Sequence, residues 1–292
     1  MNCIRFIKCF VRIVAYPFLS IYFKLFPLDI HVQSLEETIT VLSDGRKSLV
    51  RYGDGEIKLM NGGAIYFQPY TKKLAEQLSQ IISFQDENFM IGMPDVFYSL
   101  NNLVLSARIF WKYSLFLHRK MYWSLPNRVW ANTFLSRPYI DYKDKDKKVF
   151  FASLCELWNA KNVVFVEGEA TRNGIGNDLY KNTASIRRII CPATNAYSVY
   201  EEVESFILSS IDKGSLILLS LGPAAKVIAY DLYSFGFQVI DIGHLDSEYE
   251  WFIRGVKRKS KLQGKHSAES SDMHISDCTD EKYSSQIIAR FL

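Results

Sequence analysis

The 292-residue sequence has few cysteines and lacks both a dinucleotide-binding glycine motif and a long apolar run. Its five cysteines are odd in number and include no C-x-x-C pair, which argues against a disulfide framework and a thiolate zinc site and favours a reducing cytoplasm. The G-x-G-x-x-G fingerprint is missing, which counts against a standard dinucleotide site. In the amino-terminal segment the longest uncharged run, residues 13–23, has eleven residues, against the ~20 needed to cross a bilayer.

Acidic residues are absent from residues 1–28, which hold four basic ones. The whole chain has 35 Lys and Arg against 31 Asp and Glu, so residues 29–292 balance at 31 of each sign. This balance argues against nucleic-acid binding, which needs a basic stripe that neutralises several phosphates at once. With 48% hydrophobic and 23% charged residues, the composition is that of a globular chain with a sizeable core.

The amino-terminal segment, residues 3–28, mixes basic and large apolar side chains. Arranged as a helix, it places Arg5, Lys8 and Arg12 on one face, which is typical of a helix lying in an anionic membrane interface. Pro17 is expected to kink or end this helix, and the cleavage site of a secretory signal is missing. We predict attachment to the membrane surface through residues 3–28; the alternative is a terminal helix packed on the domain by its apolar side.

Further along the chain, nearly all-apolar strands alternate with helices, which predicts an α/β fold with a mainly parallel sheet covered on both faces. Helices are expected over 34–45, 71–83, parts of 95–125, 149–160, 198–212 and 224–235, and strands over 48–52, 162–167, 188–191, 215–221 and 237–242. We predict three regions: a basic membrane-surface segment over 1–30, a catalytic domain over 31–265 and a flexible tail over 266–292.

Polar residues that follow the predicted strands are the site candidates, because ligands of open parallel sheets bind beyond the carboxyl ends of the strands. Asp54 and Glu56 lie one residue apart in a glycine-rich turn, where both could reach one divalent cation or, through it, a diphosphate. A tight turn with two solvated acids fits the same pattern. Gly222-Pro223 opens a helix whose free amides favour an anionic group, although many strand-to-helix turns are built this way.

The end of strand 237–242 carries His244, Asp246, Glu248 and Glu250. Carboxylates this close raise one another's pKa unless they share a cation or a proton, which is typical of a working site. The alternative is a hydrated acidic helix start that complements the helix dipole. One of these carboxylates could deprotonate a sugar hydroxyl, with His244 as orienter, ligand or alternate base.

A long polar loop over 167–178 follows another strand. In it, Arg172 could pair with a phosphate, and Asn177 or Asp178 could hydrogen-bond ribose or sugar hydroxyls. A structural network between Arg172 and Glu167 or Glu169 fits the loop equally well.

Five stretches taken together resemble the GT-D-type glycosyltransferases. These stretches are RYGDGE at 51–56, VEGEATRNGIGNDLY at 166–180, IRRIICPATNAY at 186–197, LSLGPAAKVIAYDL at 219–232 and DIGHLDSEYEW at 241–251. The resemblance implies a Rossmann-like sheet and a nucleotide-sugar donor such as UDP-glucose. It also implies a manganese or magnesium ion, held by Asp54 and Glu56, at the donor diphosphate.

The polar residues at the strand ends and the resemblance together give expected roles to individual positions. The expected donor-binding residues are Arg51, Gly53, Asp54, Glu56, Arg172, Asn177, Asp178, Asn195, Gly222 and Pro223. The catalytic base is expected in the last stretch, with Glu250 as first choice, Asp246 or Glu248 next, and His244 beside them. Ala224 departs from the pattern, because a hydroxyl residue is expected after Gly-Pro.

The sequence therefore predicts a metal-dependent transferase that moves a hexose, glucose or galactose, from a UDP-sugar to a glycan. The expected acceptor is a lipid-linked capsule or O-antigen intermediate at the inner face of the cell membrane, and no nucleic acid is expected as a partner. Two alternatives remain: a metal-dependent phosphohydrolase acting on a nucleotide or sugar phosphate, and a nonenzymatic glycan-binding module.

Overall fold

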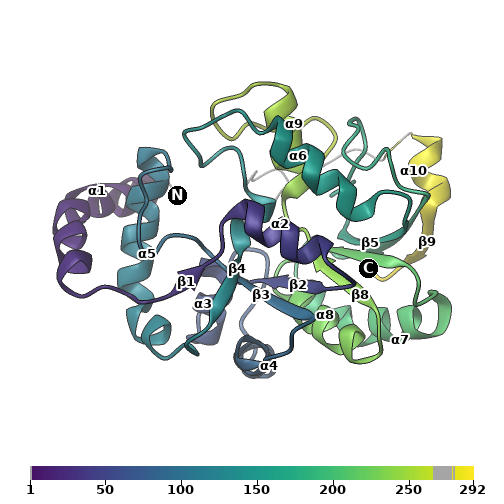
Figure 1. Cartoon of the computed structure of the whole chain (residues 1–292), viewed down its shortest axis with the longest axis horizontal. Coiled ribbons are helices and arrows are strands. Elements are labelled where there is room, and N and C mark those ends of the chain that lie inside the picture. The colour runs from purple at the N-terminus through teal and green to yellow at the C-terminus, as the bar shows by residue number, and fades with distance from the viewer. Residues whose placement is uncertain (1, 266–277, 279) are drawn as a thin grey trace.

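The computed structural model describes residues 2–265, 278 and 280–292, and of residues 2–5 and 8 it describes only the backbone. In this part of the chain, a parallel sheet of nine strands forms the centre (Figure 1). The strand order is β1-β4-β3-β2-β8-β7-β5-β6-β9, and every neighbouring pair is parallel. The strands are β1 His31–Val32, β2 Ser48–Arg51, β3 Phe89–Met93, β4 Val129–Asn132, β5 Asn162–Gly168, β6 Ser185–Cys191, β7 Leu216–Ser220, β8 Gln238–Asp241 and β9 Ile287–Arg290.

Helices cover both faces of this sheet. They are α1 Asn2–Leu25, α2 Leu35–Ser43, α3 Asp54–Met60, α4 Lys72–Ser83, α5 Leu105–Trp123, α6 Lys148–Cys155, α7 Tyr200–Ser210, α8 Ala224–Ser234, α9 Leu245–Ile253 and α10 Glu281–Gln286. Helices α4 and α7 pack against α8 on one face, and α2 packs against α6 on the other (Figure 1). The central strands β2, β7 and β8 are buried almost throughout, as expected of a sheet covered on both sides. The predicted α/β architecture is confirmed.

Most predicted elements have a counterpart within a few residues, and local chemistry explains their ends. Helix α2, for example, begins with a capping box, because the Ser34 hydroxyl accepts the Glu37 N–H at 3.0 Å while the Glu37 carboxylate accepts the Ser34 N–H at 2.7 Å.

The structure corrects the sequence-based assignment at three places. Residues 53–56 are not a turn but the start of α3, with Gly53 as its N-cap. Strands β3 and β4 were not among the predicted elements. The predicted flexible tail is wrong for residues 281–290, which form α10 and β9, and β9 pairs with β6. The rest of the predicted tail lies largely outside the described part, which omits residues 266–277 and 279. Only four residues long and preceded by a polar stretch, β9 carries little local signal.

The amino-terminal segment is helical, as predicted, but Pro17 lies inside α1 instead of ending it. One side of α1 packs on α5, where the Tyr22 and Phe116 rings are 5.3 Å apart. The Arg12 guanidinium lies over the rings of Phe110 and Tyr113, at 5.2 and 5.4 Å, so Arg12 faces the domain and not the outer surface expected for it. In the described residues, no helix has the length and apolar character that a membrane span requires.

Candidate active site

A pocket of about 800 Å³ opens at the carboxyl ends of the strands. Its walls come from the segments that follow β4, β2, β8, β7, β5 and β6, and from the start of α5. Because β2, β8 and β7 are neighbours in the sheet, the acids at 54–56, the Gly222 turn and the segment at 243–247 all line this pocket. The fold thus brings together three segments that are far apart in the sequence.

Asp54 and Glu56 lie in the first turn of α3 but face different surroundings. Asp54 is exposed to the pocket; nearby protein atoms displace water and raise its carboxyl pKa, an effect that Arg137 partly opposes. Glu56 is buried, and its carboxylate accepts the Gly53 N–H at 2.9 Å and lies 2.8 Å from the Lys226 ammonium. Asp54 therefore has the more open carboxylate of the two.

Four charged side chains form a buried network in the pocket floor. The Asp241 carboxylate lies 2.7 Å from the Arg51 guanidinium and 3.0 Å from the Lys226 ammonium, which in turn contacts Glu56. Burial raises the pKa of Asp241, but the two cations lower it, so that the net pKa lies below the usual value. The network pairs two basic with two acidic side chains, which offsets the cost of burying their charges.

The residues present form at most part of a site for a divalent cation. In the described part of the chain, no three His, Cys, Asp or Glu side chains are grouped so that they could hold a metal ion. The Glu56 carboxylate already contacts Lys226, which leaves Asp54 as the open ligand. Magnesium and similar ions are commonly held by one or two carboxylates together with substrate phosphates. The open carboxylate of Asp54 fits this pattern, and Glu56 lies beside it, held by Lys226 and the Gly53 N–H.

The four candidates at 244–250 do not all line the pocket. His244 and Asp246 line the pocket, whereas Glu248 and Glu250 do not. Glu250, the first choice for the base, is buried, and its oxygens lie 2.5 Å from the Lys265 ammonium and 2.6 Å from the Arg254 guanidinium. Asp246 also lies 2.5 Å from the Lys265 ammonium. The pocket side of α9 therefore presents His244 and Asp246.

Glu248 does not line the pocket and is fully buried. Its Oε2 accepts the backbone N–H groups of Tyr139 and Ile140 at 2.9 and 2.8 Å. Its Oε1 has no hydrogen-bond partner in the described part of the chain. Burial raises the pKa of this carboxyl to about 7, although the two N–H groups oppose the shift.

This pKa predicts a measurable pH dependence of stability. A carboxyl whose pKa is raised by folding stabilises the fold fully below its unfolded pKa, and loses that contribution as pH rises through the folded value. We expect the free energy of unfolding of the native chain to fall between about pH 4.5 and 7 relative to that of Glu248→Gln, which cannot titrate. Urea denaturation at several pH values measures this difference, and parallel pH profiles for the two proteins would contradict it.

The polar loop after β5 mainly braces the pocket walls. Glu167 pairs with Arg188 at 2.6 Å, and not with Arg172 as the structural alternative supposed. Arg172 donates to the Gly264 carbonyl at 2.7 Å, and Asn177 donates to Asp246 at 2.8 Å. The exposed Asp178 carboxylate accepts bonds from the Lys181 ammonium and the Tyr249 hydroxyl, at 2.8 and 2.6 Å. Arg172, Asn177 and Asp178 are not among the lining residues, so direct donor contacts from them are not supported.

Asn195 likewise fixes a wall and does not line the pocket. Its backbone N–H donates to the Phe67 carbonyl at 2.7 Å, and its side-chain oxygen accepts from Gln68 at 2.8 Å. These bonds hold the Phe67 ring against the turn at Gly222, which lines the pocket while Pro223 does not. Of the ten expected donor-binding residues, Arg51, Gly53, Asp54, Glu56 and Gly222 line the pocket.

The Gly222 turn leaves no room for a side chain. Gly222 has a φ of +54°, and an added Cβ would lie 2.6 Å from a carbon of the Phe67 ring. We expect Gly222→Ala to lower the free energy of unfolding by about 1–3 kcal/mol more than Gly176→Ala, because the second site has a similar φ but open space. Urea denaturation of both variants tests this. Equal losses would mean that the Phe67 ring moves aside without cost.

Several lining residues were not predicted from the sequence. Lys226 stands in the otherwise apolar first turns of α8, and a lysine that the helix period places in the core is itself a signal of a paired or functional charge. The basic run 257–259 and Arg137 also line the pocket. Nothing in the local sequence indicates their position, because distant segments deliver them.

The comparisons with known proteins agree with this geometry. A family model described as "Glycosyltransferase GT-D fold" matches residues 49–270. "Probable glycosyl transferase Gly" of Streptococcus gordonii is 42% identical over 265 residues, which are 89% of this chain and 39% of that protein. "Glycosyltransferase GlyD" of Streptococcus pneumoniae serotype 4 is 41% identical over 271 residues, 91% of this chain and 33% of that protein. The chain thus spans about two fifths or less of these curated relatives.

Solved structures match over nearly their whole length. One, described as "The highly conserved domain of unknown function 1792 has a distinct glycosyltransferase fold", has a TM-score of 0.87 and 38% identity, covering 96% of this chain and 99% of that one. Another, "A New Glycosyltransferase (DUF1792) from Streptococcus sanguinis", has a TM-score of 0.86 and 41% identity, covering 90% of this chain and all of that one.

Proposed function

Because the chain belongs to the glycosyltransferase GT-D fold family, we propose that its pocket transfers a hexose, glucose or galactose, from a UDP-sugar to a hydroxyl of a glycan. The observation that carries this proposal is the meeting of Asp54, the Gly222 turn and His244 in one pocket. In an open parallel sheet, this is where a nucleotide ligand binds.

The donor diphosphate would lie between the Gly222 turn and the basic lining residues. The amides at the start of α8 favour an anionic group. Lys226 lies beside this turn, donating to the Gly222 carbonyl at 3.1 Å, and Arg137 and the run 257–259 add positive charge to the lining. The amides at the start of α8, Arg137 and the run 257–259 would stabilise the charge that develops on the departing UDP, since the charge of Lys226 is already paired with Glu56 and Asp241.

Asp54 and Glu56 would hold manganese or magnesium together with the diphosphate. When bound, the ion would act as a Lewis acid on the phosphate oxygens. The chain's own part is to keep Asp54 open to the pocket and to hold Glu56 in place through Lys226 and the Gly53 N–H.

The base that accepts the proton of the sugar hydroxyl would come from the start of α9. His244 and Asp246 are better placed than Glu248 and Glu250, since both line the pocket. Asp246 is held by the Gly174 N–H at 2.7 Å and by Lys265, which fixes its orientation. Glu250 would serve to position Lys265.

We further propose that the acceptor is a lipid-linked capsule or O-antigen intermediate and that the chain acts at the inner face of the cell membrane. The support for this is the basic, apolar helix α1, whose outer side is exposed.

The proposal is tested by incubating the protein with UDP-glucose or UDP-galactose and manganese, with and without a glycan acceptor. We expect a saccharide product only when the acceptor is present, and a rise in melting temperature on addition of the donor with metal. Release of free sugar regardless of acceptor would favour the phosphohydrolase. Binding that survives chelation without any turnover would favour the glycan-binding module.

A further inference from the structure

We propose that α1 and the last turns of α5 form one surface that binds an anionic lipid bilayer, with Trp123 in the membrane interface. The role of this binding, access to a lipid-linked acceptor, rests on the proposed function. The binding itself does not, since it is measured without donor or acceptor.

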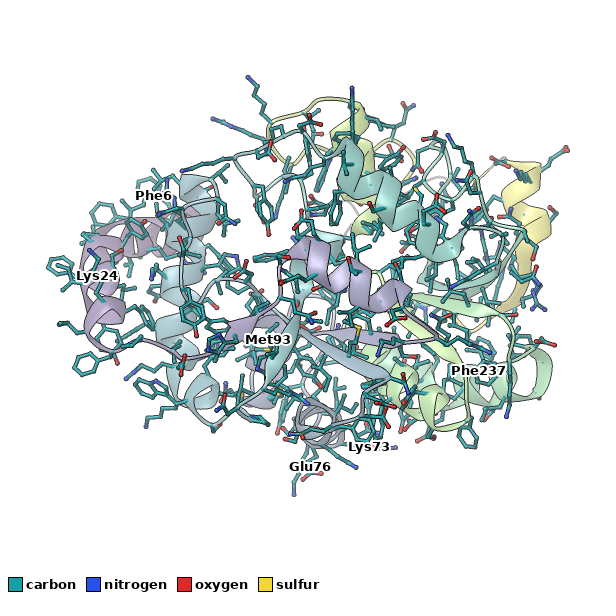
Figure 2. All side chains as sticks on the ribbon, in the orientation of Figure 1. Phe6, Lys24, Lys73, Glu76, Met93 and Phe237 are labelled. Atoms are coloured by element: carbon teal, nitrogen blue, oxygen red, sulfur yellow. The ribbon has the colours of Figure 1, made fainter. Side chains whose placement is uncertain are left out.

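The side of α1 turned away from α5 is apolar and open to solvent. Phe6, Phe18 and Leu25 are 72%, 70% and 69% exposed. Figure 2 shows Phe6 and Lys24 at the same end of the molecule. The other exposed apolar side chains of this segment are Ile7, Phe10, Val11, Ile13, Val14, Ile21 and Phe26. A contiguous apolar surface of this kind marks an interaction site.

Helix α5 continues this surface. Phe116 packs against Tyr22 of α1, with ring centroids 5.3 Å apart. Lys120 and Trp123 follow Phe116 by four and seven residues, so they lie on the same side of α5, beyond the part that α1 covers. Both are exposed, and Trp123 is 51% accessible. Tryptophan at such a position is typical of the boundary between lipid and water.

The charge of the two helices selects an anionic bilayer over a second copy of the chain. Lys24 of α1 and Lys120 of α5 are exposed, and neither helix contains an acidic residue. Two such surfaces facing each other would repel, whereas anionic lipids attract each Lys or Arg near the membrane. Charge complementarity therefore points to a membrane.

The same helix connects this surface to the active site. Ala107, Phe110 and Trp111 of α5 line the pocket, and Arg12 of α1 lies 5.2 Å above the Phe110 ring. An α-helix with its side chains is about 10 Å across. A bilayer on the outer side of α1 and α5 would thus lie near the pocket wall, where a lipid-linked acceptor could enter.

The chain carries its own reporter for this contact. Of its five tryptophans, all of which the structure describes, Trp111, Trp130, Trp158 and Trp251 are buried and Trp123 is exposed. With vesicles of brominated phosphatidylglycerol and phosphatidylcholine, we expect quenching of the tryptophan fluorescence that Trp123→Phe removes. Co-sedimentation with these vesicles should exceed that with phosphatidylcholine alone.

Matched variants distinguish vesicle binding through the α1 and α5 surface from nonspecific binding through any exposed apolar residue. We expect Phe18→Ser to weaken vesicle binding about tenfold and Lys120→Gln about fivefold. Val149→Ser, at an 80% exposed apolar position on α6, should leave binding unchanged. Absence of binding to anionic vesicles, or equal loss in all three variants, would overturn the proposal. Sedimentation without quenching at Trp123 would overturn the part played by α5, and a dimer that Phe18→Ser dissociates would assign the face to a second copy.

These outcomes do not depend on catalysis. A protein that binds vesicles through Trp123 but transfers no sugar would leave this inference standing and contradict the proposed function. A protein that transfers sugar but does not bind vesicles would contradict this inference and leave the proposed sugar transfer standing.

Discussion

Asp54→Asn is expected to lower sugar transfer about a thousandfold while the protein stays folded. The substitution keeps the size of the side chain but removes the open carboxylate at the pocket wall, where the charge of the departing diphosphate has to be balanced. Because its surroundings already disfavour the ionised form and raise its pKa, losing the charge should cost the fold little. Release of UDP from UDP-glucose with acceptor and manganese measures the activity, and urea denaturation measures the stability.

The control is Glu87→Gln, an exposed acid that does not line the pocket. Its activity should equal that of the native chain. If Asp54→Asn turned over at the native rate, the assignment of Asp54 to the donor metal would be wrong. If higher manganese concentrations restored part of the lost activity, the assignment would gain direct support.

Asp241→Asn is expected to lower the free energy of unfolding by about 3–5 kcal/mol. The Asp241 carboxylate is fully buried between Arg51 and Lys226, at 2.7 and 3.0 Å, so its neutralisation leaves a buried positive charge without compensation. The matched control is Glu201→Gln, which breaks the exposed pair with Lys73 and should change stability little.

A double variant tests whether these charges act as one network. Adding Lys226→Met to Asp241→Asn removes the excess positive charge and leaves Arg51 and Glu56 as one charge of each sign, so the pair should lose less stability than the sum of the single changes. Strict additivity would mean that Asp241 and Lys226 stabilise the fold independently. The pH dependence has a defined sign as well: since the Asp241 pKa is lowered by folding, its contribution is present above the ordinary pKa of a carboxyl and is lost in acid.

The sequence predicted the fold where the signal is local. Apolar strands such as 162–167 and the capping residues Ser34 and Glu37 determine their own elements through neighbours in the chain. Strands β1, β3, β4 and β9 were not predicted. Length alone does not explain this, because β2 and β8 are also four residues long and were predicted; the missed strands obtain their stability from partners distant in sequence.

For the candidate site, the sequence identified the segments better than the side chains. Asp54, Gly222 and His244 do meet, because they follow strands that are neighbours in the sheet. The carboxylates of α9 are held by Lys265 and by the backbone N–H of Tyr139. Neither partner belongs to the local pattern at 244–250. The same limit applies to Lys226, whose partners Glu56 and Asp241 come from two other parts of the chain.

Strand β9 has a consequence for the order of assembly during synthesis. Its residues, Ile287–Arg290, pair with β6, which the ribosome completes far earlier. Until β9 emerges, the backbone groups along that side of β6 have no strand beside them, and an uncovered edge of this kind can recruit another nascent chain. A growing polypeptide of this protein would therefore be most prone to aggregate after β6 has emerged and before β9 has, and the pairing of β9 with β6 would end that period.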